Sequence, residues 1–387
     1  MARLGDLCDI LNGYAFKSEQ YVDSGIRIIR IANVQKGYIE DSAPVFYPID
    51  STEYKKYELF EGDLLLSLTG NVGRVALLQK EFLPAALNQR VACLRIKDES
   101  VLKKAFLFSV LDSDYFENKC IESSKGVAQK NMSTEWLKEY NIPLFSMEEQ
   151  LRISNEIDTI NNLISLRKQQ LSKLDELVKS RFIEMFGDIK TGDYKFETRI
   201  LGEVAEVGSS HRVFTTEFVE EGIPFYRGTE IGELANGIKP ENPYRITKEH
   251  YERLASDETK PKIGDLLMPS ICNKGQVWMV DTDEPFYYKD GRVLCISPNR
   301  KLFNCKYLEQ FMREKTLVEY PKLGSGSTFA EFKIFLLKDI EVLIPPIELQ
   351  NQFAAFVEQT DKSKFEIQKS LEKLETLKKA LMQKYFG

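Results

Sequence analysis

The sequence predicts an α+β protein in which two repeated globular domains are separated by two long helices that pair antiparallel as a coiled coil. Three observations predict this fold. The chain repeats itself, each copy ends in a long heptad-patterned segment, and each copy begins with short β-like runs. The 387 residues are 43% hydrophobic and 29% charged, a composition that forms a sizeable core and excludes a disordered chain.

The internal repeat is read directly from the sequence. Residues 150–187 and 350–387 align without a gap at an offset of 200, and both end in Phe-Gly. Further upstream, the sequence Gly-Asp-Leu-Leu at 62–65 recurs at 264–267, with the small change of offset that insertions in loops produce. A unit of roughly 190 residues is therefore present twice, and each copy runs from a globular part into a helical tail.

The repeat divides the chain into five segments. We expect a first globular domain over 1–146, a first helix over 147–187, a linker over 188–198, a second globular domain over 199–345 and a second helix over 346–387. The linker is polar and rich in turn-forming residues. Within the globular parts, shorter helical patterns occur over 101–120 and 307–319.

The two tails carry apolar residues at alternating spacings of four and three, which is typical of a coiled-coil seam. The apolar positions that we expect to form the spacer or to bind a partner are Ile153, Ile157, Ile160, Ile164, Leu171, Leu174 and Val178, then Phe353, Val357, Ile367, Leu371, Leu374 and Leu381. A helix of this length, about 57 Å, needs a partner along its side. The simplest partner is the other tail, and pairing with a second copy of the chain remains the alternative.

Catalytic and metal-binding motifs are absent from the sequence, so we expect no enzyme activity, no cofactor and no metal site in this chain. Neither a dinucleotide-binding Gly-x-Gly-x-x-Gly nor a phosphate-binding Gly-x-x-x-x-Gly-Lys-Ser/Thr occurs. The six cysteines lie far apart and only two histidines accompany them. No apolar run of about 18 residues and no signal-peptide pattern occurs, which predicts a cytoplasmic protein without membrane contact.

The net charge of −6 limits how this chain could bind nucleic acid. A protein that binds DNA alone usually carries a basic excess, because it neutralises phosphates. Any contact with DNA therefore needs local basic patches or a basic partner.

Three types of loop recur in both copies, and their composition suits nucleic acid. Glycine allows the backbone to approach a phosphate, Asn and Gln pair with adenine, and Arg pairs with guanine or phosphate. The candidate DNA-binding residues are Thr69, Asn71, Arg74, Asn88, Gln89, Arg90, Lys125, Gln129 and Lys130 in the first copy, and Asn273, Lys274, Lys289, Arg292, Ser325, Ser327 and Thr328 in the second. Each loop is also compatible with an ordinary turn, so the hypothesis depends on their parallel occurrence.

The lead-in to the second tail carries a family resemblance. The sequence Ile-Pro-Pro-Ile-Glu-Leu-Gln at 344–350, followed by a heptad helix that ends in Tyr385-Phe386-Gly387, resembles the specificity subunit of type I restriction–modification systems. The order of globular domain, helix, globular domain and helix resembles it as well. The first copy keeps Glu148 and Gln150 but has Phe145-Ser146 in place of the two prolines.

The resemblance implies a non-catalytic subunit with two target-recognition domains, each reading half of a bipartite, asymmetric site in double-stranded DNA. It implies that the helices set the distance between the two halves. The partners that it implies are two methyltransferase subunits and, optionally, two ATP-driven restriction subunits. The alternative from another class is a coiled-coil scaffold whose globular domains bind other proteins.

Overall fold

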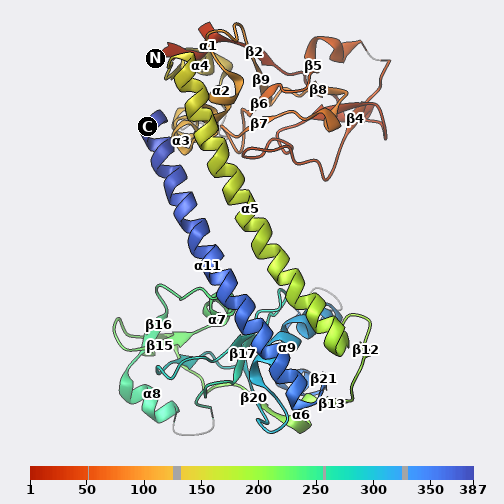
Figure 1. Cartoon of the computed structure of the whole chain (residues 1–387), viewed down its shortest axis with the longest axis vertical. Helices are drawn as coiled ribbons and strands as arrows, with labels where there is room; N and C mark the ends of the chain where they lie inside the picture. The colour runs from red at the N-terminus through yellow and green to blue at the C-terminus, as the bar shows by residue number, and fades with distance from the viewer. Residues whose placement is uncertain (51, 125–131, 256–258, 325–329) are drawn as a thin grey trace. The chain divides into compact units, whose positions relative to one another are not determined.

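The computed structural model describes residues 1–50, 52–124, 132–255, 259–324 and 330–387. The chain forms two compact units (Figure 1). Unit 1 consists of Met1–Gln169 with Gln368–Gly387, and unit 2 consists of Gln170–Ile367. The prediction of two α+β repeats, each followed by a long helix, is confirmed.

Unit 1 is built around short strands. The first sheet has the order β2 (Cys8–Asn12), β9 (Val91–Ile96), β6 (Leu64–Ser67) and β7 (Val75–Leu77), and its neighbours are antiparallel. The second has the order β4 (Phe46–Tyr47), β3 (Ile26–Ile29), β8 (Ala85–Leu87) and β5 (Glu58–Leu59), and β1 (Ala2–Arg3) pairs with β10 (Asn141–Ile142). The helices are α1 (Leu4–Leu7), α2 (Lys104–Leu111), α3 (Asp114–Ser123), α4 (Thr134–Glu139), the first part of α5 (Met147–Phe186) and the last part of α11 (Ile347–Phe386).

Unit 2 repeats this plan. Its first sheet has the order β14 (Ala205–Gly208), β20 (Val293–Pro298), β17 (Leu266–Pro269) and β18 (Trp278–Met279), and its second has the order β16 (Tyr244–Ile246), β15 (Ile223–Tyr226) and β19 (Tyr287–Tyr288). The pairs β13 (Thr198–Ile200) with β21 (Glu341–Leu343) and β11 (Gly187–Asp188) with β12 (Asp193–Tyr194) complete its strands. Its further helices are α6 (Leu201–Val204), α7 (Gly228–Ala235), α8 (Lys248–Leu254), α9 (Cys305–Glu319) and α10 (Ile334–Lys338).

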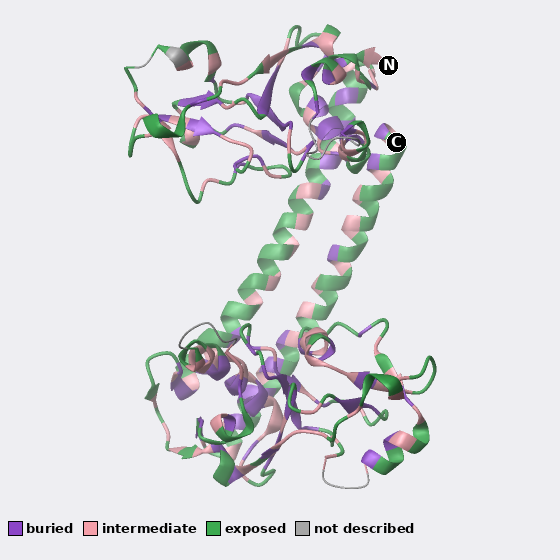
Figure 2. Cartoon of the chain, turned by 180° about the vertical axis from the view of Figure 1, so that it is seen from behind, coloured by how far each residue is buried: buried purple, intermediate pink, exposed green. Residues whose placement is uncertain are grey.

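The central strand β6 is buried on both faces, which explains its continuous apolar sequence. Leu64 and Leu66 belong to the cluster that contains Phe106 of α2, whereas Leu65 belongs to the cluster that contains Ile29 of β3. One face of the sheet therefore packs on helices and the other on the second sheet. Figure 2 shows such buried residues in purple along the strands of both units.

The repeated Gly-Asp-Leu-Leu sequence forms the turn that leads into each central strand. Gly62 and Gly264 have φ angles of +78° and +83°, a conformation that favours glycine. The buried Asp63 carboxylate accepts a hydrogen bond from the Phe60 N–H at 2.8 Å, and Arg95 pairs with it at 2.7 Å. In unit 2, Asp265 forms the equivalent bonds with the Lys262 N–H and with Arg300, at 2.9 and 3.0 Å.

The helical pattern over 101–120 corresponds to two helices, α2 and α3, rather than to one continuous helix. The helical conformation is interrupted at Ser113. The backbone of Ser113 is extended, and its hydroxyl accepts a hydrogen bond from the Phe116 N–H at 3.2 Å. A serine in this position is an N-cap, so it begins a new helix rather than continuing the old one. In unit 2 the expected helix over 307–319 begins earlier, at Cys305, where Asn304 is the N-cap.

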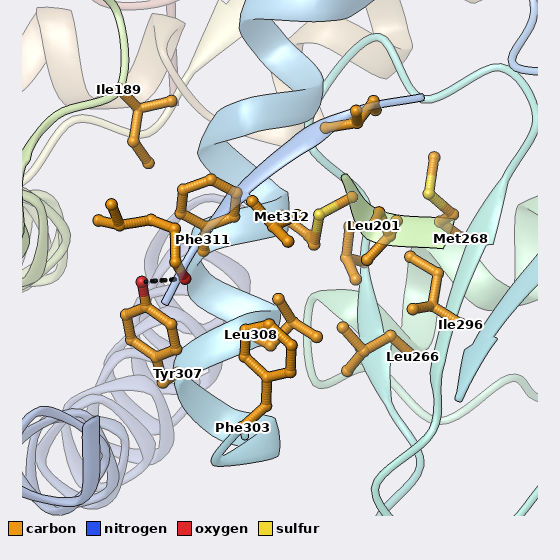
Figure 3. Close-up of a cluster of buried hydrophobic side chains, with 14 of the residues drawn as sticks. Ile189, Leu201, Leu266, Met268, Ile296, Phe303, Tyr307, Leu308, Phe311 and Met312 are labelled. Carbon is orange, nitrogen blue, oxygen red and sulfur yellow. Dashed lines mark hydrogen bonds between the residues drawn. The ribbon is translucent and has the colours of Figure 1, made fainter. Parts of the chain in front are cut away.

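Each long helix ends in the core of the unit formed by the other repeat. Phe186, at the end of α5, is fully buried in unit 2, with its ring centroid 5.0 Å from that of Tyr307 and 5.5 Å from that of Phe353 (Figure 3 shows this cluster around Tyr307). Phe386, at the end of α11, is buried in unit 1, with its ring 5.8 Å from that of Phe106. The repeated Phe-Gly therefore marks an exchange of helix ends between the repeats.

Between these ends the two helices run antiparallel. In unit 1, Lys168 pairs with Glu375 at 3.3 Å, and in unit 2, Lys364 pairs with Asp175 at 2.6 Å. Every apolar seam residue named from the sequence is buried or half-buried. None of the described helices, the two of 40 residues included, is long and apolar enough to cross a membrane.

A buried glutamine fixes the start of each long helix. The Gln350 side chain accepts a hydrogen bond from the Asn304 N–H at 2.9 Å and donates to the carbonyl oxygens of Leu302 and Pro345 at 2.9 and 2.8 Å. Gln150 forms the equivalent three bonds, each of 2.9 Å, with backbone groups of Val101, Lys103 and Phe145. Both glutamines are fully buried, so these bonds are shielded from water.

The first prediction concerns this glutamine. We expect Gln350→Ala to lower the free energy of unfolding by about 1–3 kcal/mol, because three backbone groups lose their partner in a buried place. Urea titration followed by circular dichroism measures the change. Gln352→Ala, an exposed position on the same helix, is the control and is expected to change stability by less than about 0.5 kcal/mol. Equal effects of the two substitutions would contradict the role of the buried amide.

The second prediction concerns the exchanged helix ends. Phe186→Ala is expected to destabilise unit 2 by about 3–5 kcal/mol, because it leaves a cavity among buried aromatic rings. Hydrogen exchange measured by mass spectrometry is expected to show lost protection in β14, β17 and α9 and unchanged protection in β2, β6 and α2. Phe365→Ala is the control, because that side chain is 66% exposed. Loss of protection in unit 1 instead would show that Phe186 belongs to the core of its own repeat.

Candidate nucleic-acid interface

In unit 1, loops that are distant in the sequence meet where the central strand β6 ends. The Leu68 N–H donates a hydrogen bond to the Arg90 carbonyl oxygen at 3.0 Å. The Met132 N–H donates to the Leu68 carbonyl oxygen at 2.8 Å. The residue after the strand therefore joins the turn at 88–90 to the segment that begins at Met132.

Unit 2 has the same arrangement after β17. The Ser270 N–H donates to the Arg292 carbonyl oxygen at 2.9 Å, and the Phe332 N–H donates to the Ser270 carbonyl oxygen at 2.7 Å. The two units thus share a backbone frame that brings together the first two loop types predicted from the sequence. The predicted residues of the third loop type, Lys125, Gln129, Lys130, Ser325, Ser327 and Thr328, lie outside the described residues.

The loop after β6 is held by Ser67, which is fully buried. Its hydroxyl donates to the Asn71 carbonyl oxygen and accepts a hydrogen bond from the Arg74 N–H at 3.0 Å. The side chain of Asn71 is exposed, whereas Thr69 is half-buried. Arg74 is half-buried too, and its guanidinium donates to the side-chain oxygen of Gln35. Of the three residues predicted in this loop, Asn71 is therefore the one whose side chain is exposed.

The turn at 88–90 is fixed by backbone hydrogen bonds and exposes two of its three side chains. The Asn88 N–H donates to the Ile29 carbonyl oxygen at 3.2 Å, and the Gln89 N–H donates to the Tyr14 carbonyl oxygen at 2.9 Å. Asn88 itself is half-buried, and the side chains of Gln89 and Arg90 are exposed. Within the part of the chain that the structure describes, no ion pair or side-chain hydrogen bond engages the Arg90 guanidinium.

The corresponding loop of unit 2 presents Asn273 and Lys274 to solvent. It is anchored by Gly275, which has a φ of +67° and lies so close to α9 that a Cβ atom would stand 2.6 Å from the Arg313 carbonyl oxygen. Cys272 is buried beside it, and burial raises the pKa of its thiol to about 11. The thiol is therefore neutral at pH 7, and Cys272 is one of the buried residues that support the loop.

Arg292 occupies the place of Arg90 in the repeat, but it is ion-paired. Its guanidinium lies 2.6 Å from the Glu331 carboxylate, which Lys333 also contacts. Hydrogen bonding from Lys333, together with the charges of both cations, holds the pKa of the Glu331 carboxyl below its usual range. Nearby, the Lys289 side chain is exposed, and its backbone N–H donates to the Tyr226 carbonyl oxygen at 2.9 Å.

Two residues that the sequence analysis did not identify contribute to these loops, namely Gln35 and Glu331. Each contacts a predicted arginine from a distant part of the chain, so the pairing depends on the fold and has no local sequence signal. Among the described residues, no group of three or more His, Cys, Asp or Glu side chains could hold a metal ion. The arrangement instead offers amide, ammonium and guanidinium donors on glycine-containing turns, which suits phosphates and base edges.

Comparison with known proteins identifies the family. The sequence profile of the type I restriction modification DNA specificity domain matches residues 1–176 and 194–379. These two matches cover most of the chain, so it belongs to this family.

The relatives and a solved structure agree with that assignment. The chain is 29% identical over 184 residues to the type I restriction enzyme MjaVIII specificity subunit of Methanocaldococcus jannaschii, a match that covers 46% of this chain and 43% of that protein. The chain thus spans less than half the length of this relative. It is 23% identical over 420 residues to the EcoBI specificity subunit of Escherichia coli, covering 99% of this chain and 84% of that one. The crystal structure of a type I restriction–modification S subunit from M. genitalium has the same fold, with a TM-score of 0.59, 16% identity, and coverage of 100% and 95%.

Proposed function

We propose that this member of the type I specificity family is the non-catalytic DNA-reading subunit of a restriction–modification complex. Each unit reads one half of a bipartite, asymmetric DNA site and directs a partner adenine methyltransferase to it. The observation that carries the proposal is the shared backbone frame after β6 and β17, which gathers polar loops in both units. The coiled-coil scaffold alternative is not favoured, because the family assignment covers both globular parts.

The proposed readers are the exposed side chains on this frame. Asn71, Gln89 and Arg90 supply donors in unit 1, and Asn273, Lys274 and Lys289 supply them in unit 2. Amides bind adenine in the major groove, whereas arginine and lysine bind guanine or phosphate. The remaining residues that the sequence analysis nominated, at 125–130 and 325–328, lie outside the described residues.

The net charge of −6 supports a role within a larger complex. Partners that surround the DNA would neutralise phosphates that this chain leaves uncontacted. We assign two methyltransferase subunits to this role, with two restriction subunits in the complete enzyme and a cytoplasmic location. Exposed apolar residues along α5 and α11 suit such partners, notably Leu166, Leu177, Phe365 and Leu377, which are 48–66% exposed.

The third prediction tests the turn at 88–90. Arg90→Ala is expected to weaken DNA binding by the chain in complex with its methyltransferase, without lowering thermal stability, because the described structure shows no partner for this guanidinium. If Arg90 contacts a phosphate, the slope of log K against log salt becomes less negative by about 0.9; if it contacts a base, about 1–3 kcal/mol of discrimination is lost at one position. Fluorescence anisotropy measures the first over a salt series and the second over a set of sites with single base-pair substitutions.

Arg3→Ala is the matched control for that experiment. Arg3 lies on β1, outside the loops, and its ion pair with Glu139 at 3.2 Å is exposed. The control is expected to leave both affinity and salt slope unchanged. Identical DNA binding by the Arg90→Ala and native complexes would remove this turn from the interface.

The fourth prediction tests the independence of the two readers. Replacing residues 199–345 with the matching domain of another family member is expected to change one half of the methylated site only. Phe186 and Phe353 lie outside the exchanged residues but belong to the core of unit 2. The incoming domain must therefore carry a helix that packs on these two rings as α9 does. Methylation mapping by long-read sequencing gives the outcome, and a change in both half-sites would contradict independent reading.

The fifth prediction tests the proposed spacing role of the helices. Inserting one heptad into both helices, after Gln169 in α5 and after Ile367 in α11, keeps the seam in phase. Seven residues add about 10 Å, so the non-specific spacer is expected to grow by about three base pairs with unchanged half-sites. Insertion into α5 alone is the control, because it puts the seam out of register and is expected to lower stability instead. A heptad insertion that leaves the spacer length as it was would end the spacing proposal.

A further inference from the structure

In unit 2, an arginine follows the strand β15 at the edge of the sheet where the proposed reading loops lie. β15 and β19 are parallel neighbours, so their carboxyl ends share one edge, and Arg227 follows the first strand as Lys289 follows the second. The Lys289 N–H donates to the Tyr226 carbonyl oxygen at 2.9 Å. On the other side of Arg227, a Cβ atom on Gly228 would stand 3.9 Å from the Arg292 carbonyl oxygen. Arg227 therefore lies beside the frame that holds the loops of this unit.

A buried carboxylate fixes the guanidinium of Arg227. Glu230, which is 5% exposed, accepts hydrogen bonds from Nη2 of Arg227 at 2.6 Å and from Nε at 3.2 and 3.3 Å. It also accepts a hydrogen bond from the backbone N–H of Arg227 at 2.8 Å. Burial by itself raises the pKa of the Glu230 carboxyl, but the hydrogen bonds and the charge of Arg227 bring this pKa below its usual range. The carboxylate is therefore ionised at pH 7 and holds one edge of the guanidinium.

Two aromatic rings support the same guanidinium. The Cζ atom of Arg227 lies 4.5 Å from the centre of the Tyr244 ring, within the range of a cation–π interaction. The Tyr244 ring in turn stacks on that of Phe218, with 4.6 Å between the centroids and 13° between the planes. The guanidinium is thus held by a carboxylate and by a ring, so little side-chain freedom is left to lose when it binds a ligand.

The remaining edge of the guanidinium is available to a ligand. Among the residues that the structure describes, no hydrogen bond or ion pair engages Nη1 of Arg227, and 40% of the side-chain surface is exposed. The guanidinium carries five N–H donors in one plane, and Glu230 binds the edge formed by Nε and Nη2. The edge formed by Nη1 and Nη2 still offers two parallel donors, which match O6 and N7 of guanine in the major groove.

The carboxylate favours a base over a phosphate as the ligand. Together, Arg227 and Glu230 carry no net charge, so the pair attracts a distant phosphate only weakly. A phosphate at the free edge would also be repelled by the nearby Glu230 charge. Guanine presents two acceptors without a net charge, so it gains the directional hydrogen bonds without that repulsion.

The equivalent arginine of unit 1 is held differently. Arg30 follows Gly25 at the distance at which Arg227 follows Gly222, and its N–H donates to the buried Asn33 side chain at 2.8 Å. Asn33 thus occupies the place of Glu230, but it has no charge, and the Arg30 guanidinium instead donates to the Ala43 carbonyl oxygen at 2.9 Å. The arginine fixed by a buried carboxylate is therefore a feature of unit 2 at this place of the repeat.

We propose that Arg227 reads a guanine in the half-site of unit 2, donating from Nη1 and Nη2 to the O6 and N7 atoms, and that Glu230 is the residue that positions it. This proposal rests on the proposed function, because it requires that unit 2 bind DNA through the major groove. It assigns to unit 2 a half-site with at least one G·C pair, in either orientation, whose identity depends on Arg227.

The test uses the chain in complex with its methyltransferase and the half-site that the domain exchange assigns to unit 2. Each guanine of that half-site, on either strand, is replaced in turn by 7-deazaguanine, which lacks the N7 acceptor. Fluorescence anisotropy is expected to show binding about 5- to 10-fold weaker at one position for the native complex. Arg227→Lys keeps the charge but not the paired donors, so it is expected to remove this sensitivity and to leave the salt slope unchanged.

Glu230→Gln tests the positioning role. It is expected to reduce discrimination at the same base pair and to make the salt slope more negative, because the Arg227 charge is then uncompensated. Arg227 is partly exposed, so Arg227→Lys keeps the test valid if loss of the buried carboxylate disturbs folding. Arg199→Lys is the matched control, because Arg199 pairs with Glu197 at 3.0 Å on β13, away from the loops, and it is expected to leave every base preference unchanged.

The outcomes separate this proposal from the proposed function. A half-site of unit 2 without a G·C pair, a native complex that tolerates 7-deazaguanine at every position, or full sensitivity in Arg227→Lys would each overturn the role of Arg227 and leave DNA reading intact. A native complex that binds DNA without sequence preference would overturn both.

Discussion

The burial of one phenylalanine at the end of each long helix is the constraint on which both units depend. Phe186 completes the core of unit 2, and Phe386 completes the core of unit 1. Each unit therefore needs the globular part and helix start of one repeat together with the helix end of the other. The ends are fully buried while seam positions such as Ile164 and Ile367 are only half-buried, so the pairing of the helices is anchored at their ends. Neither repeat contains a complete hydrophobic core of its own.

This construction separates the parts that hold the fold from the parts that face outward. Backbone hydrogen bonds through Leu68 and Ser270 fix where the loops lie, and the buried Gln150 and Gln350 fix where the helices begin. None of these bonds requires a particular side chain on the exposed loops. The loops can therefore differ between the two units while the frame stays the same. Arg90 and Arg292 illustrate the point, because they share a backbone position and differ in that, among the residues described, Arg292 contacts a carboxylate and Arg90 does not.

The repeat, the fold class and the two helices could be predicted from the sequence, because periodicity and self-similarity are read from the residues without knowing which of them are in contact. The composition of the loops was enough to nominate DNA-binding residues, but it could not predict which loops lie next to one another. That Leu68 joins the turn at 88–90 to Met132 is a contact between distant residues and has no local signature. The polar composition of 188–198 hid its packing role, since Ile189, Tyr194 and Phe196 are the few residues that face the core. Likewise, the sequence showed that Phe-Gly recurs but not that each copy lies in the other repeat's unit.

The distribution of ion pairs explains how an acidic chain can still present basic groups on the loops that we propose to bind DNA. Arg95 and Arg300 are paired with the buried carboxylates of Asp63 and Asp265, where they hold the turns before the central strands. Those charges are neutralised within the fold and contribute little to the field outside it. The arginine at 90 and the lysines at 274 and 289 are exposed at the loop ends, so these loops present positive charge to solvent although the total is negative. Local placement of charge, rather than its sum, therefore determines which surface attracts a phosphate, and the short range of screened interactions reinforces this.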